Sequence, residues 1–380
     1  MPTALVNARV LTPQGWRNDA AVIVADGRVD AICDAARVPA DVTRHDLAGR
    51  ILLPGFIDCQ VNGGGGVLFN DQPGVAGIRA IGAAHRRFGT TGFLPTLISD
   101  VPEKMPIAIA AVDAAIAQGV PGVLGIHLEG PFISRERKGV HAAAFLHSPD
   151  ADELRTAGSL RHGKTVLTLA PECVPADAIR QLVAAGVIVV AGHSNADYAT
   201  VRAALDAGVR GFTHLYNAMS PLGSRAPGMV GAALDDADAW CGVIVDGHHV
   251  DPASLRIALK AKPRGKVLLV TDAMPPVGAA DPAYVLNGET IVARDGICQT
   301  ANGTLAGSAL SMIDAVRNAV AMLGVTLEEA ARMASTYPAD FLGLAATHGR
   351  IAPGYRADFT VVDRDLRVTE TWIGGTSLPA

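Results

Sequence analysis

Carboxylate and imidazole side chains follow several short apolar runs of this chain. Four of these runs end in residues that could do chemistry together: Glu129, His193, His214 and Asp272. Histidine and carboxylate ligands suit Zn²⁺ or Fe²⁺, and three protein ligands leave a coordination position for water. One such residue alone would be an ordinary hydrogen-bonded core residue. Four suitable types at four run ends predict a hydrolytic metal site, provided that the runs end at one place.

The apolar runs predict strands that are buried on both faces, as in a parallel sheet. They alternate with Ala-rich amphipathic stretches, which predicts a (β/α)8 barrel whose strand ends meet at one mouth. A doubly wound sheet is the alternative. Its usual size of about five or six strands would leave runs unassigned, and the glycines at 63–66 lack a phosphate-binding fingerprint. The runs are 51–57, 91–97, 123–128, 165–169, 187–191, 211–213, 241–245 and 267–271.

The two ends of the chain differ from its middle. Residues 1–52 and 347–380 alternate apolar and polar positions between turn signals, as short antiparallel strands do. We expect them to pair into one small β-sandwich domain beside a barrel over 53–346. Asn-Gly and Asp-Gly turns at about 284–304 predict a β-hairpin insert near the barrel mouth. The predicted fold class is therefore α/β, a (β/α)8 barrel with a small β-sandwich domain formed by both termini.

Composition argues against several classes of partner. Lys and Arg number 32 and Asp and Glu 37, a net charge of -5 without a basic run, so we expect no nucleic acid. No apolar segment approaches the ~18 residues that span a bilayer, so we expect no membrane partner. The five cysteines form no Cys-x-x-Cys pair, which is typical of buried thiols in a reducing compartment. We expect a cytoplasmic protein.

The chain resembles the N-acetylglucosamine-6-phosphate deacetylase family of the amidohydrolase superfamily, in motifs that follow in order along nearly its whole length. The resemblance implies metal-dependent hydrolysis of N-acetyl-D-glucosamine 6-phosphate to D-glucosamine 6-phosphate and acetate, in amino-sugar catabolism and cell-wall recycling. The motifs are IHLEGPF at 126–132, AGHSN at 191–195, THLYNAM at 213–219 and VTDA at 270–273, with PGFID at 54–58 and GTLAGS at 303–308.

The resemblance also implies roles for single residues. Glu129, His193 and His214 would bind one divalent metal per subunit, with Zn²⁺ as the first choice and Fe²⁺ or another divalent ion as alternatives. Asp272 would be the acid–base residue, for which the plain alternative is a helix N-cap. His141 would contact the acetyl carbonyl. The implied substrate contacts are Val140, His141, Asn217, Ala218, Arg225, His249, Leu305, Ala306 and Gly307.

Four of these contacts, Asn217, Ala218, Arg225 and His249, match the residues that hold the sugar phosphate in the family. The resemblance implies a homodimer in which Arg225 reaches the neighbouring active site. An arginine fork suits phosphate oxygens. Without the resemblance, Arg225 would be taken for an exposed loop arginine and His249 for a solvated histidine.

Two alternatives to the implied activity stay open. The substrate could be N-acetyl-D-galactosamine 6-phosphate or another N-acyl amino sugar phosphate, because motifs do not resolve the configuration of one hydroxyl. A catalytically silent amidohydrolase-like scaffold is the alternative from another class, although such a protein should have lost ligands. The role of His248 and the movement of the 133–147 loop stay open as well.

One departure from the superfamily bears on the metal count. Many amidohydrolases hold a second metal with His-x-His after the first strand and a modified lysine after the fourth. Here the first place has Gln60 and Asn62, and the fourth strand is followed by Glu172. Amides are poorer ligands for Zn²⁺ than imidazole, so we expect this second position, Gln60 with Asn62, to be empty.

Metal analysis of protein purified without chelator should therefore give about one equivalent per subunit. A content close to two equivalents, with both ions needed for activity, would contradict the prediction.

Overall fold

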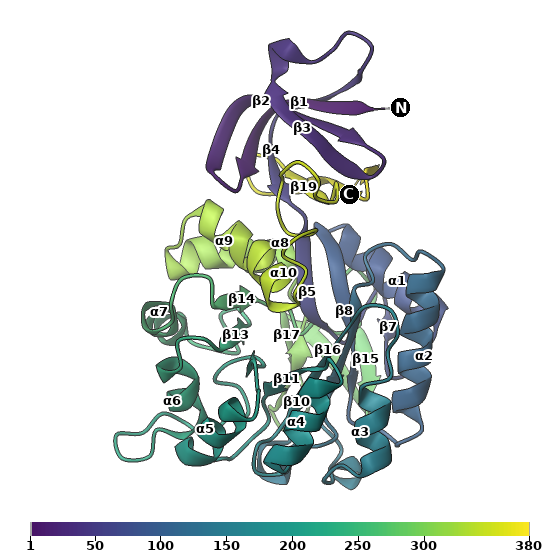
Figure 1. Cartoon of the computed structure of the whole chain (residues 1–380). Coiled ribbons are helices and arrows are strands. Elements are labelled where there is room, and N and C mark those ends of the chain that lie inside the picture. The colour runs from purple at the N-terminus through teal and green to yellow at the C-terminus, as the bar shows by residue number, and fades with distance from the viewer. Residues whose placement is uncertain (1, 380) are drawn as a thin grey trace.

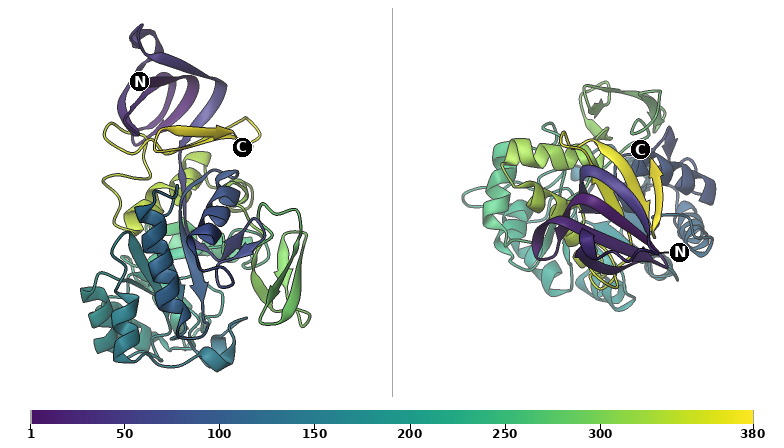
Figure 2. Two further views of the ribbon diagram at one scale, coloured as in Figure 1. Left: turned by 90° about the vertical axis from the view of Figure 1, so that its right-hand side faces the viewer. Right: turned by 90° about the horizontal axis from the view of Figure 1, so that it is seen from above.

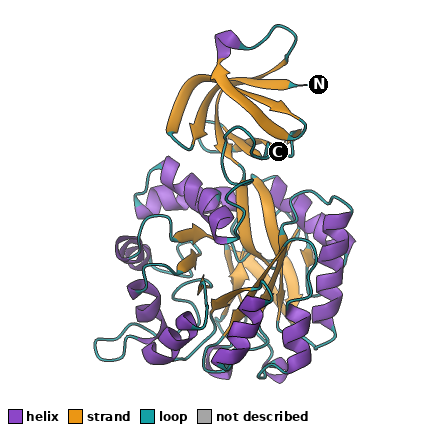
Figure 3. Ribbon diagram, in the orientation of Figure 1, coloured by secondary structure: helices purple, strands orange, loops and turns teal. Residues whose placement is uncertain are grey.

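The computed structural model describes residues 2–379 and confirms the predicted fold class. Eight parallel strands form one sheet that curves into a barrel with helices outside it (Figures 1 and 3). A second sheet stands beyond one end of the barrel, and the first barrel strand runs away from it (Figure 1). The barrel strands are β5 (Phe56–Val61), β8 (Thr90–Ile98), β9 (Gly125–Glu129), β10 (Lys164–Leu169), β11 (Ile188–Ala191), β12 (Gly211–Phe212), β13 (Trp240–Val243) and β14 (Val267–Leu269).

Helices pack around the barrel through their apolar faces. In α4, Ala178, Ile179 and Leu182 are buried, at the spacing of one helical face. Side-chain caps fix some of the helix starts, as at α5, where Asp197 accepts the backbone N–H of Thr200. The helices are α1 (Val75–Arg86), α2 (Lys104–Ala117), α3 (Ala151–Ala157), α4 (Ala176–Ala184), α5 (Tyr198–Asp206), α6 (Gly228–Asp235), α7 (Pro252–Ala261), α8 (Met312–Asn318), α9 (Leu327–Ala334) and α10 (Thr336–Phe341).

Both chain ends build the second sheet, which has seven strands in the order β21-β20-β19-β4-β1-β2-β3. Leu52, Phe359 and Trp372 are buried in its core. One pairing departs from the expected antiparallel pattern, because β1 and β4 run parallel. The strands are β1 (Thr3–Thr12), β2 (Gly15–Ala25), β3 (Arg28–Asp34), β4 (Thr43–Pro54), β19 (Phe359–Val362), β20 (Val368–Ile373) and β21 (Thr376–Pro379).

The predicted strand at 51–57 is divided between the two sheets. β4 ends at Pro54 and β5 begins at Phe56. Proline has no N–H for a ladder, and a Cβ at Gly55 would lie 2.2 Å from Thr91 Oγ1. The chain thus crosses from one sheet to the other at a residue with no side chain. The exact limits of the predicted domains stay a prediction.

The barrel closes at the end that carries Asp272. The Asp272 N–H donates to the Gln60 carbonyl at 3.0 Å, and the Gly63 N–H donates to the Ala273 carbonyl at 2.9 Å. One residue before Asp272, the Thr271 hydroxyl donates to Asp58 at 2.5 Å. These contacts join the chain after β14 to β5 and to the small hairpin that follows it. That hairpin is β6 (Gly63–Gly64) with β7 (Val67–Leu68).

The predicted insert is a four-stranded antiparallel sheet. Figure 2 shows it standing out from the side of the barrel. The Tyr284 hydroxyl donates to the Ala306 carbonyl, so the first strand of this sheet supports the last. None of the helices within residues 2–379 is long and apolar enough to cross a membrane. The strands are β15 (Ala283–Leu286), β16 (Glu289–Arg294), β17 (Ile297–Gln299) and β18 (Leu305–Ser308).

Candidate active site

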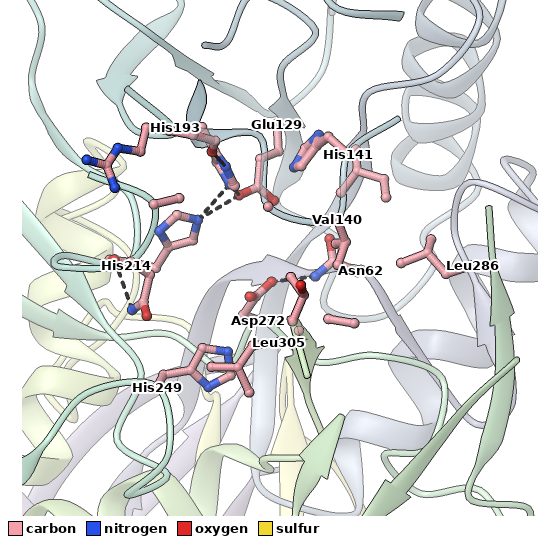
Figure 4. Close-up of a pocket in the computed structure, with 18 of the residues that line it drawn as sticks. Asn62, Glu129, Val140, His141, His193, His214, His249, Asp272, Leu286 and Leu305 are labelled. Carbon is pink, nitrogen blue, oxygen red and sulfur yellow. Dashed lines mark hydrogen bonds and ion pairs between the residues drawn. The ribbon is translucent and has the colours of Figure 1, made fainter. Parts of the chain in front are cut away.

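Most of the predicted site residues line one pocket of about 350 Å³ at the carboxyl ends of the barrel strands. Two lie outside its lining. Gln60 is buried and contacts the lining residues Glu129 and Asp272 by hydrogen bonds, and Arg225 is exposed on the loop before α6. The predicted residues in the lining are Asn62, Glu129, Val140, His141, His193, His214, Asn217, Ala218, His249, Asp272, Leu305, Ala306 and Gly307. Figure 4 shows this pocket with most of these residues labelled.

Three of these residues bring their ligand atoms together. Glu129 Oε1 lies 3.2 Å from His193 Nε2 and 3.0 Å from His214 Nε2 (Figure 4). The two Nε2 atoms are 3.0 Å apart, and all three side chains are buried. One proton between two imidazole nitrogens cannot satisfy every contact, whereas a cation among the three atoms would. The donor set of two nitrogens and one oxygen fits a divalent metal.

A backbone carbonyl sets the tautomer of His193. Its Nδ1 lies 2.9 Å from the Arg137 carbonyl oxygen, which can only accept. Nδ1 therefore carries the proton, and the Nε2 lone pair faces Glu129 and His214. Such an outer hydrogen bond is the usual way in which a metal-binding histidine is oriented.

The backbone turns sharply where three site residues leave their strands. His193, His214 and Asp272 have φ values of 47°, 31° and 53°, in the left-handed region that residues other than glycine rarely adopt. Backbone strain of this kind concentrates at functional sites. Here it points the three side chains into the barrel mouth.

The pKa of Glu129 suits a metal ligand. Burial raises the pKa of this carboxyl, but its contacts with the imidazoles of His193 and His214 outweigh burial and hold the pKa well below its ordinary value. Burial lowers the pKa of His214, yet its hydrogen bond to Glu129 leaves it raised. Glu129 is therefore ionised, as a metal-binding carboxylate must be.

Asp272 is held by two amide groups. Gln60 Nε2 and Asn62 Nδ2 donate to Asp272 Oδ1 at 3.1 and 2.6 Å. Gln60 Nε2 also donates to both oxygens of Glu129, at 3.1 and 3.2 Å. Burial, then the charge of Glu129, raises the pKa of Asp272 to about 6. At neutral pH Asp272 is thus an ionised carboxylate whose Oδ1 already accepts two hydrogen bonds.

His141 is a neutral hydrogen-bond donor. The Ser99 backbone N–H donates to His141 Nδ1 at 3.3 Å, so Nδ1 is the acceptor and Nε2 carries the proton. Burial, then the neighbouring His193, lowers the pKa of His141 to about 3. A neutral imidazole N–H in the pocket lining can stabilise negative charge that develops on a carbonyl oxygen.

An acidic residue that the sequence analysis did not place in the site orients His249. His249 Nδ1 donates to Asp246 Oδ2 at 2.6 Å, and Asp246 Oδ1 accepts the backbone N–H groups of His248 and His249. Burial raises the pKa of Asp246, but the hydrogen bond from His249 brings it to about 2. The His248 side chain is exposed and lies outside the pocket lining.

Seven lining residues were not among the predicted ones. Arg137 and Gly139 lie close to Val140 and His141 in the 133–147 loop, so proximity along the chain could have indicated them. Leu286 comes from the insert, whose position over the pocket depends on long-range packing. The additional lining residues are Ile98, Glu136, Arg137, Gly139, Met274, Leu286 and Thr304.

Family models match almost the whole chain. The amidohydrolase family model matches residues 51–378, and the NagA composite domain model matches residues 3–52. The chain belongs to the amidohydrolase family. Enzymes of this superfamily depend on metal, and the buried cluster of Glu129, His193 and His214 could hold one.

Relatives of this amidohydrolase confirm the resemblance seen in its motifs. It is 43% identical to an N-acetylgalactosamine-6-phosphate deacetylase of Shewanella sp. (strain ANA-3), over 98% of this chain and 94% of the relative. It is 36% identical to an N-acetylglucosamine-6-phosphate deacetylase of Haemophilus influenzae, over 99% of each chain. The crystal structure of N-acetylglucosamine-6-phosphate deacetylase from Pasteurella multocida superposes with a TM-score of 0.97, at 37% identity and with full coverage of both chains.

Removing one imidazole from the cluster should remove the metal. His193→Ala leaves two ligands, so we expect this amidohydrolase variant to lose both bound metal and turnover after gel filtration. The control is His248→Ala, whose side chain is exposed outside the pocket and should change neither. Elemental analysis checks this, and full metal content in His193→Ala would contradict it.

Proposed function

We propose that this protein hydrolyses the acetamide of N-acetyl-D-glucosamine 6-phosphate to D-glucosamine 6-phosphate and acetate. The carrying observation is the buried cluster of Glu129, His193 and His214 in one pocket with Asp272. The Pasteurella multocida enzyme, which shares the fold with a TM-score of 0.97, supports the reaction. Such a reaction belongs to amino-sugar catabolism.

Glu129, His193 and His214 would hold one divalent metal, and Zn²⁺ is our proposal for it. A bound divalent metal would lower the pKa of water and polarise the acetyl carbonyl. Two imidazoles and one carboxylate are a common ligand set for hydrolytic zinc.

The other residues of the pocket supply the proton transfers and the oxyanion contact. His141 Nε2–H would donate to the acetyl oxygen as it gains negative charge. Asp272 would take a proton from the attacking water and return it to the departing amine. Because Oδ1 already accepts two amide N–H groups, Oδ2 is the oxygen that would carry this proton. Without the returned proton, the tetrahedral intermediate would expel hydroxide instead of the amine.

The phosphate would be held by Asn217, the Ala218 backbone N–H and His249, which line the same pocket as the metal ligands. Asp246 fixes the His249 ring, so this imidazole is oriented before the substrate arrives. Val140 and the strand residues Leu305, Ala306 and Gly307 would cover the sugar. Backbone N–H groups and imidazoles suit an anionic phosphate.

A second candidate substrate is N-acetyl-D-galactosamine 6-phosphate. The observation that favours it is the 43% identity to the Shewanella protein named for that epimer, against 36% to the Haemophilus influenzae enzyme. The epimers share the acetamide and the phosphate, so the chemistry described above serves both.

Acetate release from the two epimeric sugar phosphates tests the proposal. The metal-loaded protein should hydrolyse the glucosamine derivative, and the ratio of kcat/KM values decides which epimer it prefers. Asp272→Asn keeps the side-chain size but cannot shuttle the proton, so we expect its kcat to fall by about 10²–10⁴-fold. Turnover of neither substrate with metal present would overturn the proposed function.

We also propose that the protein is a homodimer in which Arg225 reaches the phosphate of the neighbouring subunit. Arg225 is exposed on the loop 220–227, which follows Asn217 and Ala218. Arg225 lies outside the lining of its own pocket, and an exposed guanidinium is accessible to a second copy. The resemblance to the family supports this placement.

Mixing two defective variants tests the shared site. Arg225→Ala alone should raise KM with little change in kcat, because its charge acts on a remote group. A mixed dimer with inactive His193→Ala contains one site with intact metal ligands and an intact Arg225 from the other subunit. Recovery of low KM after mixing is the expected result, and no recovery in a demonstrated mixed dimer would contradict the proposal.

A further inference from the structure

Asn62 makes two hydrogen bonds, and its side-chain oxygen takes part in neither of them. Its backbone carbonyl accepts the N–H of Phe69 at 2.8 Å, and its Nδ2 donates to Asp272 Oδ1 at 2.6 Å (Figure 4). Its Oδ1 is buried and has no hydrogen-bond partner among residues 2–379. Buried polar atoms are nearly always paired, because an unpaired acceptor has lost its hydrogen bonds to water without replacing them. Oδ1 therefore calls for a donor from outside the chain.

The orientation of the Asn62 amide is fixed by its neighbour. Asp272 Oδ1 accepts hydrogen bonds from both Gln60 Nε2 and Asn62 Nδ2, so the nitrogen of Asn62 faces Asp272 and its oxygen faces away. The residue is 2% exposed and lines the pocket. The free oxygen belongs to a residue of the pocket wall and is shielded from bulk water.

The loop that carries Asn62 is held on both sides. The Gly63 N–H donates to the Ala273 carbonyl at 2.9 Å, and His85 Nε2 lies 2.9 Å from the Gly63 carbonyl. A Cβ at Gly64 would lie 2.8 Å from His85 Nε2, so the loop packs closely on α1. The amide of Asn62 is therefore positioned before any ligand binds.

The chemistry of the proposed substrate supplies the missing donor. The acetamide has a carbonyl, for which the metal cluster and the His141 N–H are available, and one N–H, which needs an acceptor. Asn62 Nδ2 already contacts Asp272, so a nitrogen bound at Asn62 Oδ1 lies beside the carboxyl that must protonate it. We propose that Asn62 Oδ1 accepts the substrate acetamide N–H and thereby places the leaving nitrogen next to Asp272. This inference rests on the proposed deacetylase function.

Gln60 provides a matched comparison within the chain. Its Nε2 also donates to Asp272 Oδ1, at 3.1 Å, but the residue lies outside the pocket lining. Loss of Gln60 should weaken the hold on Asp272 without removing a substrate contact. Asn62 and Gln60 thus share one role toward Asp272, and the proposal gives Asn62 a second one.

The test compares the amide substrate with an ester that lacks the N–H. The probes are N-acetyl-D-glucosamine 6-phosphate and 2-O-acetyl-D-glucose 6-phosphate, assayed on the metal-loaded protein. Asn62→Leu should lower kcat/KM for the amide about tenfold more than for the ester, the size expected for one lost buried hydrogen bond. Gln60→Met is the reference for the effect that both residues have on Asp272, and its amide-to-ester ratio should fall less than that of Asn62→Leu. If the ester is not turned over, its inhibition constant against the amide takes the place of its kcat/KM.

Two further measurements keep the result unambiguous. Asn62→Ala removes the same oxygen with a smaller side chain, so its amide-to-ester ratio should fall as in Asn62→Leu even if Asn62→Leu fails to fold. Metal content should stay at the unmodified level in all three variants. An amide-to-ester ratio that falls no further in Asn62→Leu and Asn62→Ala than in Gln60→Met would overturn the inference. If the unmodified protein releases no acetate from either epimer, the proposed function fails first.

Discussion

Three ligand atoms lie close together in the barrel mouth, and the surrounding structure must hold them there. Glu129 Oε1 and the Nε2 atoms of His193 and His214 lie 3.0–3.2 Å from one another, out of contact with bulk water. Lone pairs in a buried site repel one another unless a proton or a cation lies between them. The scaffold must therefore hold these atoms together against that repulsion. A divalent metal relieves it and turns the crowding into a binding site.

The scaffold meets this demand through strand ends that share one mouth. β9, β11 and β12 are parallel neighbours or near neighbours in the sheet, so their carboxyl ends converge. Left-handed backbone at His193 and His214 then turns the imidazoles inward. The carbonyl of Arg137 holds His193 in the tautomer that presents its Nε2 lone pair. Backbone strain and a loop hydrogen bond thus both help to hold the imidazoles in the orientation that brings their Nε2 atoms together.

Asp272 depends on the same construction from the opposite side of the mouth. Its backbone N–H closes the barrel against Gln60, and its side chain accepts the amides of Gln60 and Asn62. Gln60 and Asn62 occupy the positions where we expect no second metal, and their amide N–H groups contact the carboxylate. Neutral donors orient Asp272 while leaving its second oxygen free for proton transfer.

Local patterns in the sequence were sufficient for the barrel and for the residue types at its strand ends. Continuous apolar runs followed by Glu129, His193, His214 or Asp272 report both burial and chemistry. The run 51–57 misled, because hydrophobicity does not show that Gly55 must pass Thr91 and leave one sheet for another. The Arg137 carbonyl, the Asp246 support for His249 and the place of Leu286 over the pocket could not be predicted. They depend on backbone atoms or on contacts between distant segments, and the residue types along the chain do not reveal such contacts.

A crystal structure of metal-loaded Asp272→Asn with N-acetyl-D-glucosamine 6-phosphate is the most direct test of this account. We expect the acetyl carbonyl between His141 Nε2 and the metal on Glu129, His193 and His214, and the phosphate at Asn217, Ala218 and His249. A sugar bound the other way round, with its phosphate at the metal, or outside this pocket, would contradict the account.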